Sequence, residues 1–189
     1  MTLTTLFRPA EKKAALVYQL SLVLAGSWLI ALAAQVSIPL PFSPVPITGQ
    51  TFAVLLVGAL LGRRLAGLSV AAYLAQGLAG LPVFAGGTSG LARLLGPTGG
   101  YLVGFLAAAY LVGYLAERGW TLQVGKTLLA MILGNVLIYL CGVSYLALFL
   151  GFEKALTAGL YPFLVGDAIK ILLATLLLPL GWKVLSKFT

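Results

Sequence analysis

The sequence contains five long runs without a single Asp, Glu, Lys or Arg, at residues 14–62, 65–92, 94–116, 127–152 and 171–182. Across all 189 residues, 61% are hydrophobic and only 8% are charged. One soluble domain of this length has too small an interior to bury so many apolar side chains, so part of the exterior must face lipid. Because about 20 apolar residues span the core of a bilayer as a helix, the charge-free runs predict an all-α integral membrane protein.

Prolines, glycines and charges divide these runs into six predicted transmembrane helices, at about residues 16–37, 50–62, 65–80, 100–117, 122–150 and 159–182. Segment 38–49 contains four prolines, which lack a backbone donor and restrict the residue before them, so it is predicted to be a structured loop or a re-entrant piece. Segment 81–99 is too rich in Gly and Pro for a straight helix, and loops of this length are usually functional. We expect a single membrane domain over residues 1–189.

Lysine and arginine are distributed unequally between the two sets of predicted loops. Six helices place both termini on one side, and that side carries nine of the twelve basic residues: Arg8, Lys12, Lys13, Arg63, Arg64, Arg118, Lys126, Lys183 and Lys187. The opposite loops carry Arg93 and Lys154, and Lys170 lies inside the last helix. Because cytoplasmic loops are enriched in Lys and Arg, we expect cytoplasmic termini, including segment 1–13, in a multi-pass protein of the cell membrane. Segments 81–99 and 151–158 then lie outside.

Several function classes lack the residues that they require. The chain has no histidine, which is the commonest metal ligand and general base, and no P-loop pattern for ATP hydrolysis. Residues 87–90 match the G-x-S-G pattern of intramembrane serine proteases, but the serine has no histidine to act as its base. The basic residues behind the net charge of +8 are scattered singly or in pairs, which argues against nucleic-acid binding. We therefore expect neither an enzyme nor a metal or cofactor site.

Asp167 is the only acidic residue of the sequence inside an apolar span, and Lys170 follows three residues later. This spacing places both side chains on one face of the predicted helix 159–182, about 12 to 17 Å along it. Ionisable residues at such depth are costly unless they are paired or solvated in a cavity, so the pair predicts a polar ligand site. The alternative is a buried ion pair that only fixes this helix against its neighbours.

Two further features of the apolar helices have two interpretations each. Asn135, in the predicted helix 122–150, is a polar amide that hydrogen-bonds either a ligand or a facing helix. Ser27, Ala31 and Ala34 form a small-residue stripe on the predicted helix 16–37, which either packs internally or faces a partner subunit within the membrane.

Three stretches of sequence resemble a known family: SPVPITGQTFAVLLVGALLG at 43–62, GLPVFAGG at 80–87 and GPTGGYLVGF at 96–105. They resemble the BioY family, the biotin-binding S components of energy-coupling factor (ECF) transporters. The resemblance implies the ECF S-component fold, with six membrane helices and cytoplasmic termini. It also implies capture of biotin from outside and docking onto the transmembrane subunit EcfT, which carries two ABC-type ATPases.

The resemblance further implies a place for biotin beneath the 81–99 loop, with Asp167 and Lys170 among its polar contacts. Biotin has an apolar bicycle, a ureido group with N–H donors and a carbonyl acceptor, and a carboxylate at the end of an aliphatic tail. Arg93 is a candidate partner of the carboxylate, because its forked donors suit carboxylates; the alternative is a solvated loop charge. Other candidates for the apolar wall and for close backbone approach are Phe84, Gly86, Gly87, Gly99, Gly100 and Tyr101.

Partner docking and energy source complete the expectations from the sequence. S components of this class have a small-residue contact with EcfT on the first helix, and Ser27 with Ala31 is the nearest equivalent here. Two modes of transport stay open: a binding subunit driven by partner ATPases, or a stand-alone secondary transporter in which Asp167 exchanges a proton.

Overall fold

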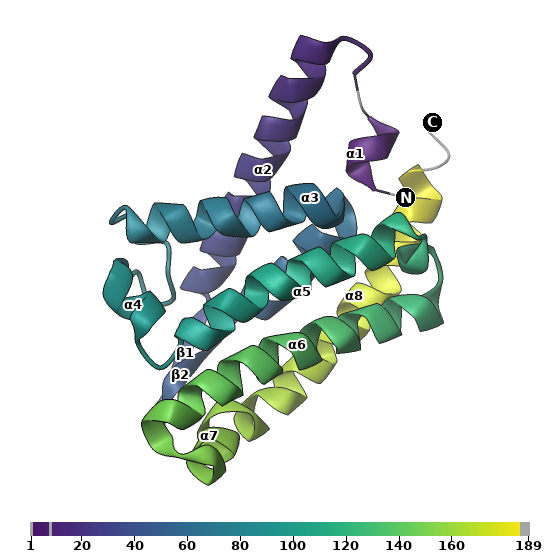
Figure 1. Ribbon diagram of the computed structural model, residues 1–189. Helices are drawn as coiled ribbons and strands as arrows, with labels where there is room; N and C mark the ends of the chain where they lie inside the picture. Colours follow the sequence, from purple (N-terminus) through teal and green to yellow (C-terminus); the bar gives the residue numbers. More distant parts are fainter. Residues whose placement is uncertain (1, 8, 186–189) are drawn as a thin grey trace.

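The computed structural model describes residues 2–7 and 9–185 as a bundle of helices with one small β-sheet (Figure 1). Arg8 and Lys187, two of the basic residues used to predict the orientation, lie outside the described residues. The long helices are α2 (Lys12–Gln35), α3 (Gln50–Leu78), α5 (Gly99–Glu117), α6 (Val124–Leu150) and α8 (Leu164–Leu185). The shorter elements are α1 (Leu3–Leu6), α4 (Leu91–Leu95), α7 (Phe152–Gly159) and single 3-10 turns at Trp120–Leu122 and Tyr161–Phe163.

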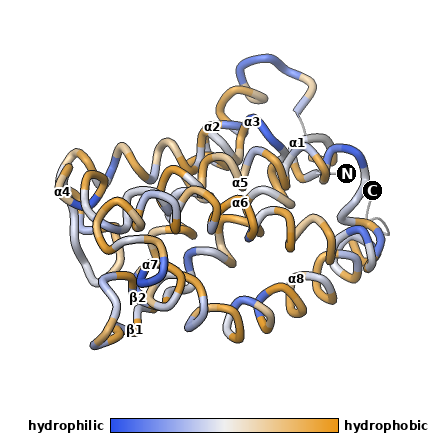
Figure 2. Tube along the Cα trace, turned by 60° about the horizontal axis from the view of Figure 1, so that its bottom comes forward, coloured by the Kyte–Doolittle hydropathy of each residue, from blue (hydrophilic) through white to orange (hydrophobic). Residues whose placement is uncertain are grey.

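Helical stretches long and apolar enough to cross a membrane number five among the described residues, counting α7 and α8 as one stretch, Phe152–Leu185. Figure 2 shows hydrophobic residues along most of the helical trace and hydrophilic residues gathered at the ends of the helices. Helices α5 and α6 are each followed by a glycine with positive φ, Gly119 (φ 81) and Gly151 (φ 80), which is the usual way to end a helix. The predicted all-α membrane class is confirmed.

Helix α3 is a folded hairpin of two shorter helices. Gly62 inside it has φ 77 and ψ 170, a conformation that glycine alone adopts readily. A straight helix would separate Gln50 from Tyr73 by about 35 Å at 1.5 Å per residue. Instead the Gln50 Nε2 donates to the Tyr73 hydroxyl at 2.7 Å, so the chain turns back at Gly62. With this bend the long helices provide six segments, as the sequence predicts.

The proline-rich segment forms a β-hairpin, which the sequence did not predict. Strand β1 (Ser37–Leu40) pairs antiparallel with β2 (Ser43–Thr48), with Ser37 opposite Thr48 and Leu40 opposite Ser43. In a sheet of two strands each strand has a free edge, so prolines fit where their missing N–H would point outward. The Ser43 hydroxyl donates to the Ala158 carbonyl at 2.7 Å, which fixes the hairpin to α7.

The start of the last helix is corrected by the structure. The sequence predicted a loop at 151–158 and a helix from about 159, whereas α7 covers Phe152–Gly159 and α8 begins only at Leu164. The break coincides with Pro162 in the short 3-10 turn Tyr161–Phe163. Asp167 therefore lies in the first turn of α8 rather than 12 to 17 Å along a helix.

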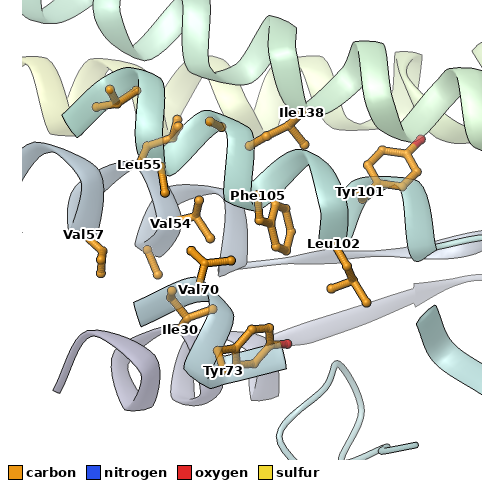
Figure 3. Packing of buried hydrophobic residues seen from close by; sticks show 14 of the residues in the cluster. Ile30, Val54, Leu55, Val57, Val70, Tyr73, Tyr101, Leu102, Phe105 and Ile138 are labelled. Carbon is orange, nitrogen blue, oxygen red and sulfur yellow. The ribbon is translucent and has the colours of Figure 1, made fainter. Parts of the chain in front are cut away.

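The core lies between α3, α5 and α6, with α2 packed against α3 (Figures 1 and 3). Figure 3 shows Val54 and Val70 of α3, Phe105 of α5 and Ile30 of α2 gathered in one cluster. Glycines allow the backbones to approach closely: a Cβ at Gly104 would lie 3.1 Å from the Ile138 carbonyl oxygen. The central layer is therefore tightly packed, and α8 closes one side of it.

Candidate functional site

A cavity lies where β2, the start of α3, α5, α6 and α8 meet beneath α4 and the turn at Phe84 and Ala85. It encloses about 670 Å³ of empty space, part of it open to solvent. Its apolar wall includes Val45, Phe84, Leu102, Phe105, Ile138 and Phe163. Leu102, Phe105 and Ile138 also belong to the core cluster, so the wall is continuous with the rigid interior (Figure 3).

An ion pair occupies one end of this cavity. Lys170 Nζ lies 2.8 Å from Asp167 Oδ1, and both side chains line the cavity. Asp167 is only 4% exposed. Its place in the first turn of α8 is favourable for a negative charge, because the helix N-terminus carries partial positive charge. The pair predicted from the sequence is therefore formed and lies in a cavity.

The N-terminal turn of α3 completes the partners of Lys170. Its ammonium donates to the Thr48 carbonyl at 2.8 Å and to the Thr51 hydroxyl at 3.0 Å, besides Asp167. The Thr51 hydroxyl in turn donates to Asp167 Oδ1 at 3.1 Å. An ammonium has three donors, and all three have partners in the protein. A ligand acceptor that bonds Lys170 must therefore replace one of them.

The second carboxylate oxygen of Asp167 is approached from α6. The Tyr139 hydroxyl donates to Asp167 Oδ2, and Tyr139 also lines the cavity. A carboxylate has about four lone-pair positions. Protein donors occupy three of them, so Oδ2 keeps one acceptor position for an N–H group of a ligand.

Arg93 of α4 and Thr98, just before α5, also line the cavity. Figure 1 shows α4 beside the ends of α3 and α5, at the same end of the bundle as α7, which leads into α8. The salt bridges of the described residues join Arg63 to Glu117 and Lys170 to Asp167, so Arg93 has no carboxylate partner there. The lining of the cavity therefore combines an ion pair on α8, an apolar wall, and an arginine on α4 that has no carboxylate partner among the described residues.

The segment at Val83 and Phe84, which borders the cavity, is held in place by side chains of α2 and α3. Gln35 Nε2 of α2 lies 3.4 Å from the carbonyl oxygens of both Val83 and Phe84. The Phe84 ring contacts the Tyr73 ring edge to face, with centroids 5.5 Å apart. Phe84 is thus fixed in the wall, as the sequence analysis expected of an apolar wall residue. Tyr101, the other predicted aromatic, lines the cavity while its hydroxyl donates to the Gly159 carbonyl at 2.7 Å.

The predicted glycines do not line the cavity. Gly86 and Gly87 have positive φ of 70 and 67 and shape the turn after Phe84. Gly100 serves helix packing, because a Cβ there would lie 2.5 Å from the Cys141 carbonyl oxygen of α6. Gly99 likewise lies against the end of α4, at the Leu94 carbonyl. These four glycines therefore affect the shape of the site indirectly, through turn conformation and through close packing of the backbone.

Asn135 and the stripe on α2 lie outside the lining of the cavity. Asn135 does not line the cavity; its Nδ2 donates to the Met131 carbonyl at 3.3 Å within α6, and it is 6% exposed. Ser27 and Ala31 are 0% and 3% exposed. Gln76 Nε2 of α3 donates to the Ser27 hydroxyl at 3.2 Å. The stripe therefore packs internally in this structure, which is the first of its two interpretations from the sequence.

The sequence analysis missed the cavity residues that hydrogen-bond the ion pair, which are Thr48, Thr51 and Tyr139. Thr48 and Thr51 belong to the segment PITGQT that already carried the family resemblance. Hydroxyl residues are common in membrane helices and give no signal of their own. Tyr139 lies four residues after Asn135 on α6, one helical turn nearer to Asp167, and nothing in its sequence context distinguishes it.

Comparison with known proteins assigns the chain to a family. A model of the BioY family matches residues 8–187. The chain belongs to the BioY family. The probable biotin transporter BioY of Pyrococcus horikoshii is 40% identical over 160 residues, covering 84% of this chain and 93% of the relative. The biotin transporter BioY of Rhizobium etli is 42% identical over 158 residues, covering 79% and 84%.

A solved structure matches the BioY fold described above. It is the crystal structure of the S-component for biotin from an ECF-type ABC transporter, with a TM-score of 0.81 and 30% sequence identity. The match covers 92% of this chain and 95% of the other. This BioY-family chain is accordingly a multi-pass protein of the cell membrane with the ECF S-component fold, and a transport protein rather than an enzyme.

Proposed function

We propose that this protein captures biotin in the cavity between α3, α5, α6 and α8 and delivers it as the S component of an ECF transporter. The observation that carries the proposal is that one apolar cavity is lined both by the Asp167 and Lys170 pair of α8 and by Arg93 of α4. Two relatives named as biotin transporters and the S-component for biotin support the choice of ligand.

The polar end suits the ureido group of biotin. A ureido N–H donates to the free acceptor position of Asp167 Oδ2, and the ureido carbonyl accepts from Lys170 in place of the Thr48 carbonyl. Hydrogen bonds to charged groups contribute more than neutral ones, about 1.5–3 kcal/mol each. The apolar bicycle lies against Phe105 and Ile138, and the tail leads its carboxylate to Arg93.

Calorimetry on the purified protein tests capture. The wild type is expected to bind biotin without nucleotide, because the site needs no partner to form. Asp167→Asn is expected to weaken binding by about a hundredfold, since it leaves the Lys170 charge without its buried partner. Glu153→Gln, an exposed acid on α7, is the matched control and should leave binding unchanged. No biotin binding to a folded wild type would overturn the proposal.

Delivery is proposed to require EcfT and two ATPases, as in an ECF assembly. The contacts of Asp167 agree with a binding role, because Lys170, Thr51 and Tyr139 all bond its carboxylate and hold it in one orientation. Proteoliposome uptake separates the two modes. Accumulation that needs the partner subunits and ATP agrees with the proposal, whereas accumulation by the chain alone, driven by a pH gradient, supports a secondary transporter.

A further inference from the structure

A surface hollow adjoins the cavity at Arg93 and Thr98. It encloses about 750 Å³ of empty space, including open solvent, and residues Pro44, Thr88, Ser89, Ala92 and Pro97 are among those that line it. Arg93 and Thr98 line both the hollow and the cavity. Arg93 therefore borders two spaces rather than one.

The hollow adjoins the cavity, because β2, the turn at residues 84–88 and the segment 93–98 contribute residues to both. Strand β2 gives Pro44 to the hollow and the next residue, Val45, to the cavity. The turn at Phe84 and Thr88 does the same: Phe84 lines the cavity, Thr88 lines the hollow, and the Phe84 N–H donates to the Thr88 carbonyl at 3.0 Å. A ligand that extends from the cavity to Arg93 thus has space to continue into the hollow.

The chemistry of the hollow is cationic and rich in hydroxyl groups. Thr88 and Thr98 donate their hydroxyls to the Ala85 and Arg93 carbonyls at 3.0 and 3.4 Å, so each still accepts. Ser89 adds a third hydroxyl, and none of the residues lining the hollow is acidic. This composition favours a polar group that carries a carboxylate over one that carries only a positive charge.

We propose that the site accepts biotin derivatives extended through the carboxyl group by an amide, with a distal carboxylate bound in the hollow beyond Arg93. The inference rests on the proposed function. In free biotin the carboxylate pairs with Arg93; in the amide the carbonyl oxygen accepts from the inner edge of the guanidinium. The distal carboxylate accepts from its outer edge and from Ser89, since a guanidinium has five N–H donors in a planar fork.

A matched pair of ligands tests the inference on the purified wild type. Biotinyl-lysine, acylated on its side-chain amine, is compared by calorimetry with biotinyl-cadaverine, which is the same molecule without the α-carboxylate. Both are freed of biotin by chromatography. Biotinyl-lysine is expected to bind at least about tenfold more tightly, as one charge-assisted hydrogen bond provides.

A variant that fills the hollow provides the second arm. Ala92 is exposed and lines the hollow but not the cavity, so Ala92→Phe is expected to keep biotin affinity within about twofold and to weaken biotinyl-lysine about tenfold or more. Biotin binding without binding of either amide overturns the inference alone. Equal affinity for the two amides, or no effect of Ala92→Phe on biotinyl-lysine, does so as well. Absence of biotin binding overturns the proposed function and this inference together.

Discussion

At the scale of single residues, the polar end of the cavity depends on hydrogen bonds that constrain one another. Asp167 and Lys170 of α8 meet Thr51 of α3 and Tyr139 of α6. A buried ion pair gains little stability by itself, because both charges lose their hydration. The neighbouring hydroxyls offset that cost and hold the carboxylate in one orientation, which is what recognition of a planar ureido group requires.

Thr51 offers a direct test of this residue-scale argument. Thr51→Val keeps the shape of the side chain and removes the hydroxyl that joins Lys170 to Asp167. Biotin affinity is expected to fall about tenfold, because one hydrogen bond to each charge is lost. Thr157→Val on α7 is the control, since that exposed hydroxyl bonds only carbonyls of its own helix. Calorimetry giving equal affinities for the two variants would contradict a role for Thr51.

The charged part of the site was predictable from the sequence and the hydroxyl part was not. A charge in an apolar run is costly, so Asp167 and Lys170 stand out in the sequence. Thr51 and Tyr139 matter because they hydrogen-bond Asp167 in the folded chain. Neither side chain is charged, so nothing in an apolar run of sequence marks them as site residues. Asn135 gives the opposite case: its polarity suggested a ligand contact, yet its amide is directed to its own helix.

At the scale of elements, the bend at Gly62 sets where the site residues lie. The bend brings the start of α3, with Thr48 and Thr51 nearby, against the second half of the same helix. Glu117 at the end of α5 anchors the bend, because its Oε1 accepts the Arg63 N–H at 3.0 Å. Helix extents followed from apolar runs, but the β-hairpin did not, since four prolines hide the strand pattern. The start of α8 was misplaced because Glu153 and Lys154 interrupt the apolar sequence, so segment 152–159 resembles a loop between two membrane helices.

The bend predicts a specific sensitivity to substitution. Gly62→Ala should lower the free energy of unfolding by about 1–3 kcal/mol, because its φ of 77 and ψ of 170 strain any other residue. An added Cβ would also lie 2.7 Å from Glu117 Oε1. Gly67→Ala is the matched control in the same element, where an added Cβ meets nothing within 4 Å. Thermal unfolding in detergent compares the two, and equal midpoints would contradict the strain argument.

At the scale of the whole molecule, the cavity lies at the opposite end of the bundle from α1 and the last turns of α8. Figures 1 and 2 both place α1 close to the last turns of α8, away from α4 and α7. Arg63, at the bend, pairs with Glu117 at the end of α5, with Arg63 Nε 3.2 Å from Glu117 Oε2. Among the described basic residues, Arg63 and Arg118 both lie over the Tyr114 ring, and Lys183 lines one hollow together with Leu122, so these three lie at one end of the structure.

This distribution predicts the orientation in the membrane, because basic residues are retained on the cytoplasmic side. Single cysteines replace Glu11, just before α2, and Glu153 on α7 in a Cys141→Ser background; both acids are exposed. On intact cells a membrane-impermeant maleimide is expected to label the cysteine at 153 and to reach the one at 11 only after permeabilisation. The background without cysteine controls for other labelling. The reverse pattern would place the cavity on the cytoplasmic side, where uptake has no substrate to capture, and labelling of both positions on intact cells would contradict their placement on opposite sides of the membrane.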